Sequence, residues 1–426
     1  MFSWRPSSLS QVRKPLLSLL LTGSALLLAT PALARNRSHG RPSNGNNPPP
    51  SQSKNEAPRS GNNASGNTVV QGCGSNAIIT IANYNVENFW DDNAENSGDQ
   101  TYNEYKKNGS NWYSGQMYKA KAQNLAEAVR MAGAPDIVAM QEFESANNAS
   151  RSLEILKPYV ESMGYKYFAL GQQNSKNPVA VTSAVMSKYP ISSNDRLDFV
   201  VTEGQFKDIN QGDETVSSLN SSARDPQVVT IDVQGQKVRI YTAHWKSRRG
   251  NPASGNVMRM AVAELTKRDI DAQRNANPNL DILVMGDFNS DYDERPLQYG
   301  MNSTDDKNLL KSDLGSDKMF NLWFELPSSE RCSYMHSGEL QCLDHMLVSS
   351  ALFDGKGIDL VEQSFQVVGH NGGEAAQKLL RNDGRTPNRW GMQKNNGSSF
   401  FTGTGYSDHL PLVAKFKIPS LCKASN

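Results

Sequence analysis

The stretch Ile282-Leu283-Val284-Met285-Gly286-Asp287-Phe288-Asn289 runs from four apolar residues into an aspartate and an asparagine. A short apolar run of this kind, bounded by polar residues and without alternation, predicts a strand that is buried on both faces. Further short apolar runs along the chain predict strands at residues 78–84, 136–140, 181–186, 228–233, 238–243, 345–348 and 412–418. Several of these runs are also apolar on both faces, so we expect sheets that are covered on both sides.

Helices are predicted between these strands, at residues 117–131, 153–163 and 257–274. In the first, apolar residues recur at three- and four-residue spacing, which is typical of a helix with one buried face. Ser152 and Asn256 precede the other two and are suitable N-caps. Strands and helices in this mixed order predict α/β layers within one domain.

The first 34 residues have the pattern of a secretory signal peptide. Three basic residues precede the apolar run 16–29, and Ala32-Leu33-Ala34 places small residues where a signal peptidase reads them. The alternative is an uncleaved membrane anchor, but the run is short for crossing hydrocarbon. No later segment is long and apolar enough to span a membrane. We therefore expect cleavage after Ala34 and export to the extracellular space or the periplasm.

The charge of the chain is uneven along its length. Residues 35–72, rich in Asn, Ser, Gly and Pro, predict a flexible linker. Subtracting +3 for residues 1–34 and +4 for residues 35–72 from the total of +1 leaves −6 for the body, residues 73–426. That charge argues against a tight, non-specific nucleic-acid coat. Two long irregular stretches in the body, 91–115 and 365–405, are candidate functional loops.

Four cysteines are present, at Cys73, Cys332, Cys342 and Cys422. An even count behind a signal peptide favours disulfides. We predict a Cys332–Cys342 bridge because the two are close in sequence, and a Cys73–Cys422 bridge that brackets the body. The alternative, a cysteine metal site, has no CxxC spacing to support it.

Polar residues stand at the ends or starts of six predicted strands. A single set of this kind is more often a turn or a helix cap than a catalytic group. In antiparallel neighbours, however, the end of one strand lies beside the start of the next, so all six sets can meet at one edge of the sheets. The sets are Asn85 with Glu87, Gln141 with Glu142, His244 with Trp245 and Lys246, Asp287 with Asn289, Asp344, and Asp408 with His409.

The residue types in these sets indicate a chemistry. Hard oxygen ligands such as Glu87 and Glu142 suit Mg²⁺, Mn²⁺ or Ca²⁺ better than Zn²⁺. Asparagines orient a phosphate or a water without adding negative charge. A histidine held by an aspartate can donate to a phosphate oxygen or exchange a proton. The combination predicts phosphodiester hydrolysis assisted by a divalent metal, with Mg²⁺ the first expectation.

The sequence resembles the endonuclease/exonuclease/phosphatase superfamily over residues 77–418. The resemblance implies a four-layer α/β sandwich, in which two packed mixed β-sheets are flanked by helices. It also makes residues 73–426 one catalytic domain. Its motifs, in order, are Tyr84-Asn85-Val86-Glu87-Asn88-Phe89, Gln141-Glu142, Ser187-Lys188-Tyr189-Pro190-Ile191, Gly286-Asp287-Phe288-Asn289 and Ser407-Asp408-His409.

The resemblance also implies a role for each matched residue. Metal ligands would be Glu142, as the principal one, with Asn85, Glu87 and Asp408. Catalytic residues would be Asp287 on the attacking water, Asn289 on the phosphate, His409 oriented by Asp344, and His244 as the second histidine. Cations for the substrate phosphate would be Lys246, Arg248, Arg249 and Arg224. A solvated charged loop explains Arg248 and Arg249 equally well. No residue matches the carboxylate that pairs with the first histidine in pancreatic-type deoxyribonucleases.

Members of this superfamily differ in substrate, and three functions remain open from the sequence. The first is a secreted nuclease with extracellular DNA, or also RNA, as its substrate and no stable protein partner. The second is a phosphodiesterase or phosphatase that acts on phospholipid or phosphoinositide head groups. The third is a non-catalytic binding protein on the same scaffold, which the intact set of acids, asparagines and histidines argues against.

Overall fold

The computed structural model describes residues 77–90, 115–144, 151–172, 181–211, 216–217, 224–370, 373–395 and 398–419. The predicted signal peptide, the predicted linker and the Cys73–Cys422 pair lie outside these residues, as does nearly all of the stretch 91–115. Within the described ranges, no helix combines the length and the apolar character needed to cross a membrane.

The first sheet is built around β1 (Ala77–Phe89), which contains the first motif. β1 runs antiparallel to β18 (Leu412–Ile418) and parallel to β2 (Ile137–Glu144). This arrangement brings the end of β1, the end of β2 and the start of β18 to one edge. The remaining strands of the sheet are β4 (Val181–Ser187), β3 (Tyr167–Leu170), β14 (Asp359–Leu360) and β15 (Gln366–Val367).

The second sheet is built around β8 (Asp281–Asp287), the strand formed by the stretch quoted first. β8 runs parallel to β7 (Gln236–His244) and antiparallel to β13 (Asp344–Val348). The sheet is mixed, as the sequence predicts. Its other strands are β5 (Ile191–Arg196), β6 (Gln227–Val233), β10 (Met319–Asn321) and β9 (Ser303–Thr304).

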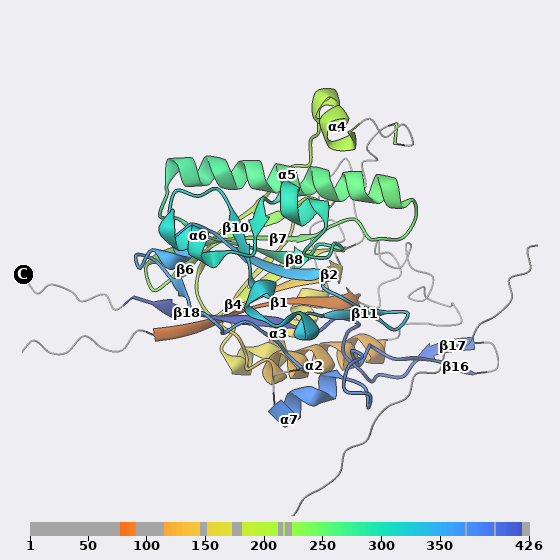
Figure 1. Ribbon diagram of the computed structural model, residues 1–426. Helices are drawn as coiled ribbons and strands as arrows, with labels where there is room; N and C mark the ends of the chain where they lie inside the picture. The colour runs from red at the N-terminus through yellow and green to blue at the C-terminus, as the bar shows by residue number, and fades with distance from the viewer. Residues whose placement is uncertain are drawn as a thin grey trace, which may run out of the picture. The chain divides into compact units, whose positions relative to one another are not determined.

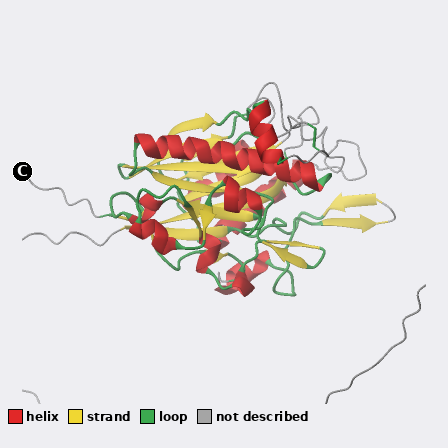
Figure 2. Cartoon of the chain, turned by 45° about the horizontal axis from the view of Figure 1, so that its top comes forward, coloured by secondary structure: helices red, strands yellow, loops and turns green. Residues whose placement is uncertain are grey.

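The two sheets pack face to face, and helices cover their outer faces (Figure 1). α2 (Gly115–Met131) and α3 (Arg151–Val160) lie on the first sheet, whereas α5 (Pro252–Ala276) lies on the second (Figure 2). The described residues thus form the predicted four-layer α/β sandwich, and the predicted fold class is confirmed.

Helix boundaries differ from the predicted ones where a cap was misread. α5 begins at Pro252 instead of residue 257, because the side chain of Asn251 accepts a hydrogen bond from the amide of Ala253. Proline suits the first turn because its missing N–H has no helical partner there. α3 gives way after Val160 to a 3-10 turn that ends at Gly164, the predicted end.

Shorter elements connect the layers. The β11–β12 hairpin lies beside the start of β18, and the β16–β17 hairpin projects away from the sheets in both ribbon views (Figures 1 and 2). The short strands and helices are β11 (Tyr334–His336), β12 (Glu339–Gln341), β16 (Met392–Asn395), β17 (Ser398–Phe401), α4 (Glu203–Asn210), α6 (Lys307–Ser312) and α7 (Gly373–Ala376). The single turns of 3-10 or π-helix are η2 (Glu161–Met163), η3 (Pro296–Gly300), η4 (Leu322–Glu325), η5 (Ser328–Glu330), η6 (Ser350–Phe353) and η7 (Gln377–Leu379).

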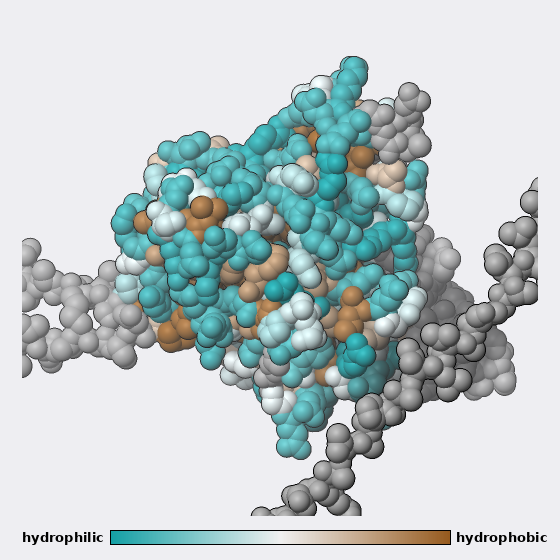
Figure 3. Space-filling view, in the orientation of Figure 1, coloured by the Kyte–Doolittle hydropathy of each residue, from teal (hydrophilic) through white to brown (hydrophobic). Residues whose placement is uncertain are grey.

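Apolar side chains fill the space between the sheets, with a polar link among them. Gln141 at the end of β2 donates from Nε2 to Asn83 Oδ1 at 2.8 Å and to Thr242 Oγ1 of β7 at 3.1 Å. The bond from Gln141 to Thr242 joins the two sheets near the edge where their polar strand ends meet. Outside, the face drawn in Figure 3 is mainly hydrophilic, and apolar residues appear in small groups. Scattered apolar side chains are normal on a soluble domain.

The cysteine prediction needs correction within the described residues. Cys332 and Cys342 flank the β11–β12 hairpin, but both are free, buried thiols in the structure. The thiol of Cys342 instead donates to the carbonyl oxygen of Arg331 at 3.0 Å. Burial raises the pKa of the Cys332 thiol to about 11, so it stays protonated near neutral pH. The predicted Cys332–Cys342 bridge is therefore absent from this structure.

Candidate active site

Strand register alone brings three of the predicted site residues side by side. His244 on β7 is paired with Asp287 on β8, and Asp344 on β13 is paired with the same aspartate. Gly286 allows β7 and β8 to approach closely here, since a Cβ at this position would lie 1.9 Å from the carbonyl oxygen of Ala243. The predicted convergence of the polar sets on one edge is confirmed for these strands.

Irregularities near the ends of β1 and β2, and the turn after β8, direct side chains into the site. Glu87, Glu142 and Asn289 adopt positive φ angles of 56°, 67° and 48°. Such angles cost on the order of 1–3 kcal/mol for a residue other than glycine and persist only where the surroundings hold them. Here the amide of Asn289 donates to Asp287 Oδ1 at 2.9 Å, and the amide of Glu87 donates to Asn85 Oδ1 at 3.0 Å.

His409 is held by an aspartate, as the resemblance implies. Its Nδ1 lies 2.7 Å from Asp344 Oδ2, which also accepts a hydrogen bond from Ser333 Oγ at 2.6 Å. Burial alone would lower the pKa of His409, but the charges of Asp344, Asp287 and Asp408 raise it well above its usual value. The ring is therefore an imidazolium. Its Nε2 lies 3.8 Å from Asp287 Oδ2 and can donate to a phosphate oxygen placed there.

His244 faces the same aspartate from the other side. Its Nε2 lies 3.6 Å from Asp287 Oδ2 and 3.7 Å from Glu142 Oε1. Its Nδ1 is buried and forms no hydrogen bond with any described residue. Burial lowers the pKa of His244 well below its usual value, and the nearby positive charges of Arg224 and His409 lower it further. This ring is therefore neutral near neutral pH.

Two carboxylates meet between these histidines. Asn85 Nδ2 donates to Asp287 Oδ2 at 2.9 Å and to Glu142 Oε1 at 3.2 Å, so both oxygens face one point. Glu142, Asp287 and His244 each offer a ligand atom within 4.8 Å of the others. Burial raises the pKa of Asp287 to about 7, with His409 opposing the rise and Asp344 and Glu142 adding to it. Hard oxygen donors crowded in this way fit a divalent cation such as Mg²⁺.

Asn85 enters this arrangement as a hydrogen-bond donor toward the carboxylates. Its side-chain oxygen is occupied by the amide of Glu87, and its backbone oxygen accepts a hydrogen bond from Ser407 Oγ at 2.7 Å. The contact with Ser407 joins β1 to the segment that carries Asp408 and His409. Asn85 thus fixes the carboxylates and the start of β18 relative to one another.

The other two predicted metal ligands, Glu87 and Asp408, face a cation of the chain itself. Arg389 Nε contacts Glu87 Oε1, and its Nη2 lies 3.8 Å from Asp408 Oδ2. Burial raises the pKa of Glu87 to about 8, and Asp408 adds to the rise, whereas Lys121 and Arg389 oppose it. The structure therefore divides the predicted metal set into two pairs.

Sequence reasoning missed both Arg389 and Lys121. Lys121 lies on α2, is fully buried, and donates from Nζ to the carbonyl oxygen of Tyr406 at 2.8 Å. No motif marks either residue. The only available signal was the long irregular stretch 365–405, which contains Arg389.

The predicted phosphate contacts occupy different positions. Arg248 is already paired, because its Nη2 lies 2.8 Å from both Asp291 Oδ2 and Glu294 Oε1. Arg224 donates from Nη1 to the carbonyl oxygen of Trp245 at 3.4 Å and so lies next to His244. Lys246 is half-buried on the loop that follows β7, and the neighbouring Arg249 is exposed.

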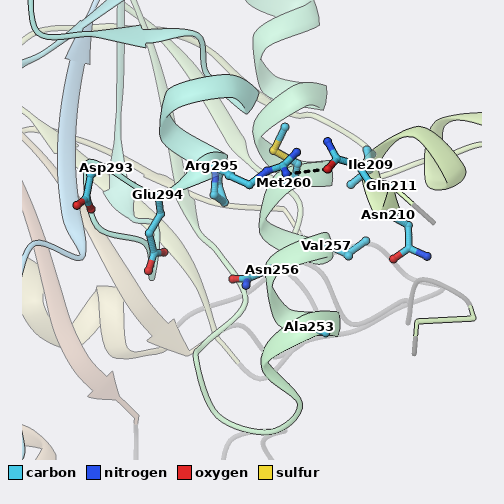
Figure 4. Close-up of a pocket in the computed structure, with 11 residues that line it drawn as sticks. Ile209, Asn210, Gln211, Ala253, Asn256, Val257, Met260, Asp293, Glu294 and Arg295 are labelled. Atoms are coloured by element: carbon cyan, nitrogen blue, oxygen red, sulfur yellow. Dashed lines mark hydrogen bonds between the residues drawn. The ribbon is translucent and has the colours of Figure 1, made fainter. Parts of the chain in front are cut away.

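A cavity of about 860 Å³ lies between α4 and α5, away from this cluster (Figure 4). Ile209 and Val257 contribute apolar side chains to its wall, and Arg295 bonds Gln211 across it at 2.7 Å. None of its lining residues belongs to the converging set. The candidate site is instead the edge where the two sheets meet.

Comparison with known proteins extends these observations. The model of the endonuclease/exonuclease/phosphatase family matches residues 80–417. No curated protein matches the sequence significantly. Similar solved structures include truncated TDP2 of Caenorhabditis elegans, with 14% identity over 80% of this chain and 98% of that chain and a TM-score of 0.44. Sphingomyelinase C of Streptomyces griseocarneus has 15% identity over 80% and 99% of the two chains and a TM-score of 0.45. The mannosyl-6-phosphatase Bt3783 of Bacteroides thetaiotaomicron has 15% identity over 79% and 99%, with a TM-score of 0.42.

Proposed function

Because the chain belongs to the endonuclease/exonuclease/phosphatase family, we propose that it is a secreted, metal-dependent nuclease that hydrolyses extracellular DNA. Members of this family are phosphoric-ester hydrolases. The observation that carries the proposal is the meeting of a charged His409 with the carboxylates of Asp287 and Glu142 at one sheet edge. A positive donor opposite a cation-binding carboxylate pair is the arrangement that a phosphodiester needs.

The chain's own residues would divide the work. His409 holds a proton at Nε2 and stabilises the negative charge that grows on the phosphate, while Asp344 fixes the ring from Nδ1. Asp287, with a pKa of about 7, accepts the proton of the attacking water. Asn289, whose Nδ2 donates to the Trp245 carbonyl oxygen at 3.3 Å, lies in the turn after β8 and would contact the phosphate beside Asp287. A divalent ion held mainly by Glu142 would supply Lewis-acid polarisation of a phosphate oxygen.

The charge around the site favours a polyanion as the substrate. The cluster lies at the edge where the two sheets meet. Lys246 and Arg249 on the loop after β7 provide positive charge beside that edge. The predicted signal peptide would export the protein to where free nucleic acid is a source of phosphate or a matrix polymer.

A substrate panel tests this proposal. Purified protein is incubated with plasmid DNA, RNA, sphingomyelin and inositol phosphates, each with Mg²⁺, Mn²⁺, Ca²⁺ or EDTA. We expect DNA cleavage that requires a divalent ion and that Glu142→Gln removes. Turnover of the lipid or the inositol phosphates without DNA cleavage would overturn the assigned substrate. Full activity in excess EDTA would overturn the metal requirement.

A further inference from the structure

Arg389 lies against Glu87 and Asp408, two of the acidic residues of the site. Its guanidinium contacts Glu87 through Nε and approaches Asp408 through Nη2 at 3.8 Å. Glu87 is only 5% exposed, whereas the side chain of Arg389 is 52% exposed. A partly buried ion pair is screened less than one between two fully exposed groups. Arg389 therefore already supplies a cation to Glu87 and Asp408.

The backbone of Arg389 is fixed to the segment that leads to Asp408. The amide of Tyr406 donates to the carbonyl oxygen of Asn388 at 2.7 Å, and the amide of Gly391 donates to Thr404 at 2.8 Å. Gly405 has a φ of 83°, and a Cβ there would lie 2.0 Å from the carbonyl oxygen of Arg389. Only glycine permits this approach. The backbone of Arg389 is therefore held in place by its contacts with the segment 404–406.

Helix α2 holds the same segment from below. Lys121 donates to the carbonyl oxygen of Tyr406 at 2.8 Å, and its Nζ lies 5.2 Å from the centre of the Trp390 ring. Asn124 Nδ2 donates to the carbonyl oxygen of Gly405 at 2.8 Å. The fully buried Lys121 also brings a second positive charge close to Glu87. Arg389 and Lys121 thus both place positive charge near Glu87.

The other two carboxylates, Asp287 and Glu142, have different neighbours. Asp287 and Glu142 both accept hydrogen bonds from the neutral side-chain amide of Asn85, at 2.9 and 3.2 Å. Among the described residues, no lysine or arginine lies within ion-pair distance of either carboxylate. Of the described basic side chains, only the two histidines approach Asp287, at 3.8 and 3.6 Å, and only His244 approaches Glu142, at 3.7 Å, so a divalent ion has no lysine or arginine to displace here. At Glu87 and Asp408, an ion would first have to displace the guanidinium of Arg389.

We propose that Arg389 is a resident cation that takes the place of a second metal ion, so that the protein binds one divalent ion and binds it at Glu142. This inference rests on the proposed metal-dependent function, but it concerns stoichiometry and selectivity within the site. Arg389 acts as a positioning residue, because it holds Glu87 and Asp408 without contacting the ion at Glu142.

Counting bound Mn²⁺ by isothermal titration calorimetry and equilibrium dialysis tests the proposal. We expect one ion per chain in the wild type and two in Arg389→Met, with the second bound more weakly. Arg381→Met is the matched control, since Arg381 is an exposed arginine of the same stretch, and it should bind one ion. If Arg389→Met fails to fold by circular dichroism, Arg389→Gln provides the same comparison with a polar side chain.

The outcomes separate this inference from the proposed function. Two ions in the wild type, or one ion in the Arg389 variants, would overturn the role of Arg389 and leave metal dependence intact. No ion in the wild type but one in Arg389→Met would support the exclusion of an ion by Arg389, but it would contradict both the single ion at Glu142 and the proposed metal dependence. No ion in either protein would overturn both.

Discussion

His409 and His244 stand on opposite sides of Asp287 and differ in charge. They are equally buried, at 6% and 5% exposure, and their Nε2 atoms lie 3.8 and 3.6 Å from the same Asp287 oxygen. Their pKa values nevertheless move in opposite directions. The difference lies at Nδ1, where His409 has the carboxylate of Asp344 at 2.7 Å and His244 has no hydrogen-bond partner among the described residues. Burial is shared, but Asp344 at Nδ1 is the largest of the contributions that raise the pKa of His409, whereas the charge of Arg224 lowers the pKa of His244 further.

Replacing His409 should produce the largest loss. His409→Ala removes the charged donor, and loss of a general acid–base group typically costs about 10²–10⁴-fold in rate. Initial rates on plasmid DNA measure the effect, with thermal unfolding as the check on folding. His336→Ala, at an exposed histidine of the β11–β12 hairpin, is the control. A folded His409→Ala variant with near wild-type turnover would remove His409 from the mechanism.

Asp344→Asn should do less harm and should also change the pH dependence. The ring remains but loses its orienting charge, and loss of such a partner typically costs on the order of 10–100-fold. Because Asp344 raises the pKa of His409, its removal should move the alkaline fall in rate to lower pH. The measurement is the pH–rate profile, with the surface variant Asp232→Asn as control. An unshifted alkaline limb would mean that Asp344 does not set the charge of His409.

His244→Gln should cost less again. Glutamine keeps a neutral donor near the place of Nε2, so we expect a loss of about one neutral hydrogen bond, roughly fivefold to tenfold. Because His244 is neutral near neutral pH, the loss should be the same across that pH range. The rates of His244→Gln and His409→Gln, measured side by side, give the comparison directly. Equal losses in both variants would contradict the distinction between the two histidines.

The smallest expected effect is the change with pH in the stability of the metal-free protein. Burial raises the pKa of Asp287 to about 7 and that of Glu87 to about 8, above the values of about 4 expected for unfolded carboxyl groups. The folded form therefore binds more protons, and the stability that these two groups contribute is present at acid pH and lost as the pH rises through about 7 and 8.

We thus expect the melting temperature of the metal-free protein to be lower at about pH 8.5 than at about pH 6. Mn²⁺ should raise it more at the higher pH, because the ion offsets the charge of the ionised carboxylates. Differential scanning calorimetry with and without EDTA measures both effects. A metal-free protein that gains stability over this range would show that the carboxylates are not held as described.

Sequence reasoning reached the fold and much of the site because both depend on strand ends. Once strands 238–243, 282–285 and 345–348 are recognised as neighbours, His244, Asp287 and Asp344 must lie together. Strand order does not predict which charged residue a given arginine or lysine contacts. Arg248 was assigned to the phosphate, yet the chain turns after Asn289 so that Asp291 and Glu294 meet it.

Arg389 and Lys121 could not be found from sequence for a related reason. Lys121 lies on the buried side of α2, where the other residues are apolar. The apolar periodicity of the helix therefore gives no sign that a lysine is buried there. Arg389 reaches Glu87 across about 300 residues of chain, by contacts that no local pattern encodes. The missing Cys332–Cys342 bridge shows the same limit, because closeness in sequence does not determine how two thiols face each other.

The central claim is that one sheet edge holds a charged and a neutral histidine on either side of Asp287. Titration of the histidine ring nitrogens by ¹⁵N NMR in the wild type and in His409→Gln and His244→Gln tests it most directly. The account predicts that the His409 ring stays protonated well above the usual histidine pKa of about 6.5 and that the His244 ring is neutral at that pH. Two rings that titrate together near that pH would contradict the account.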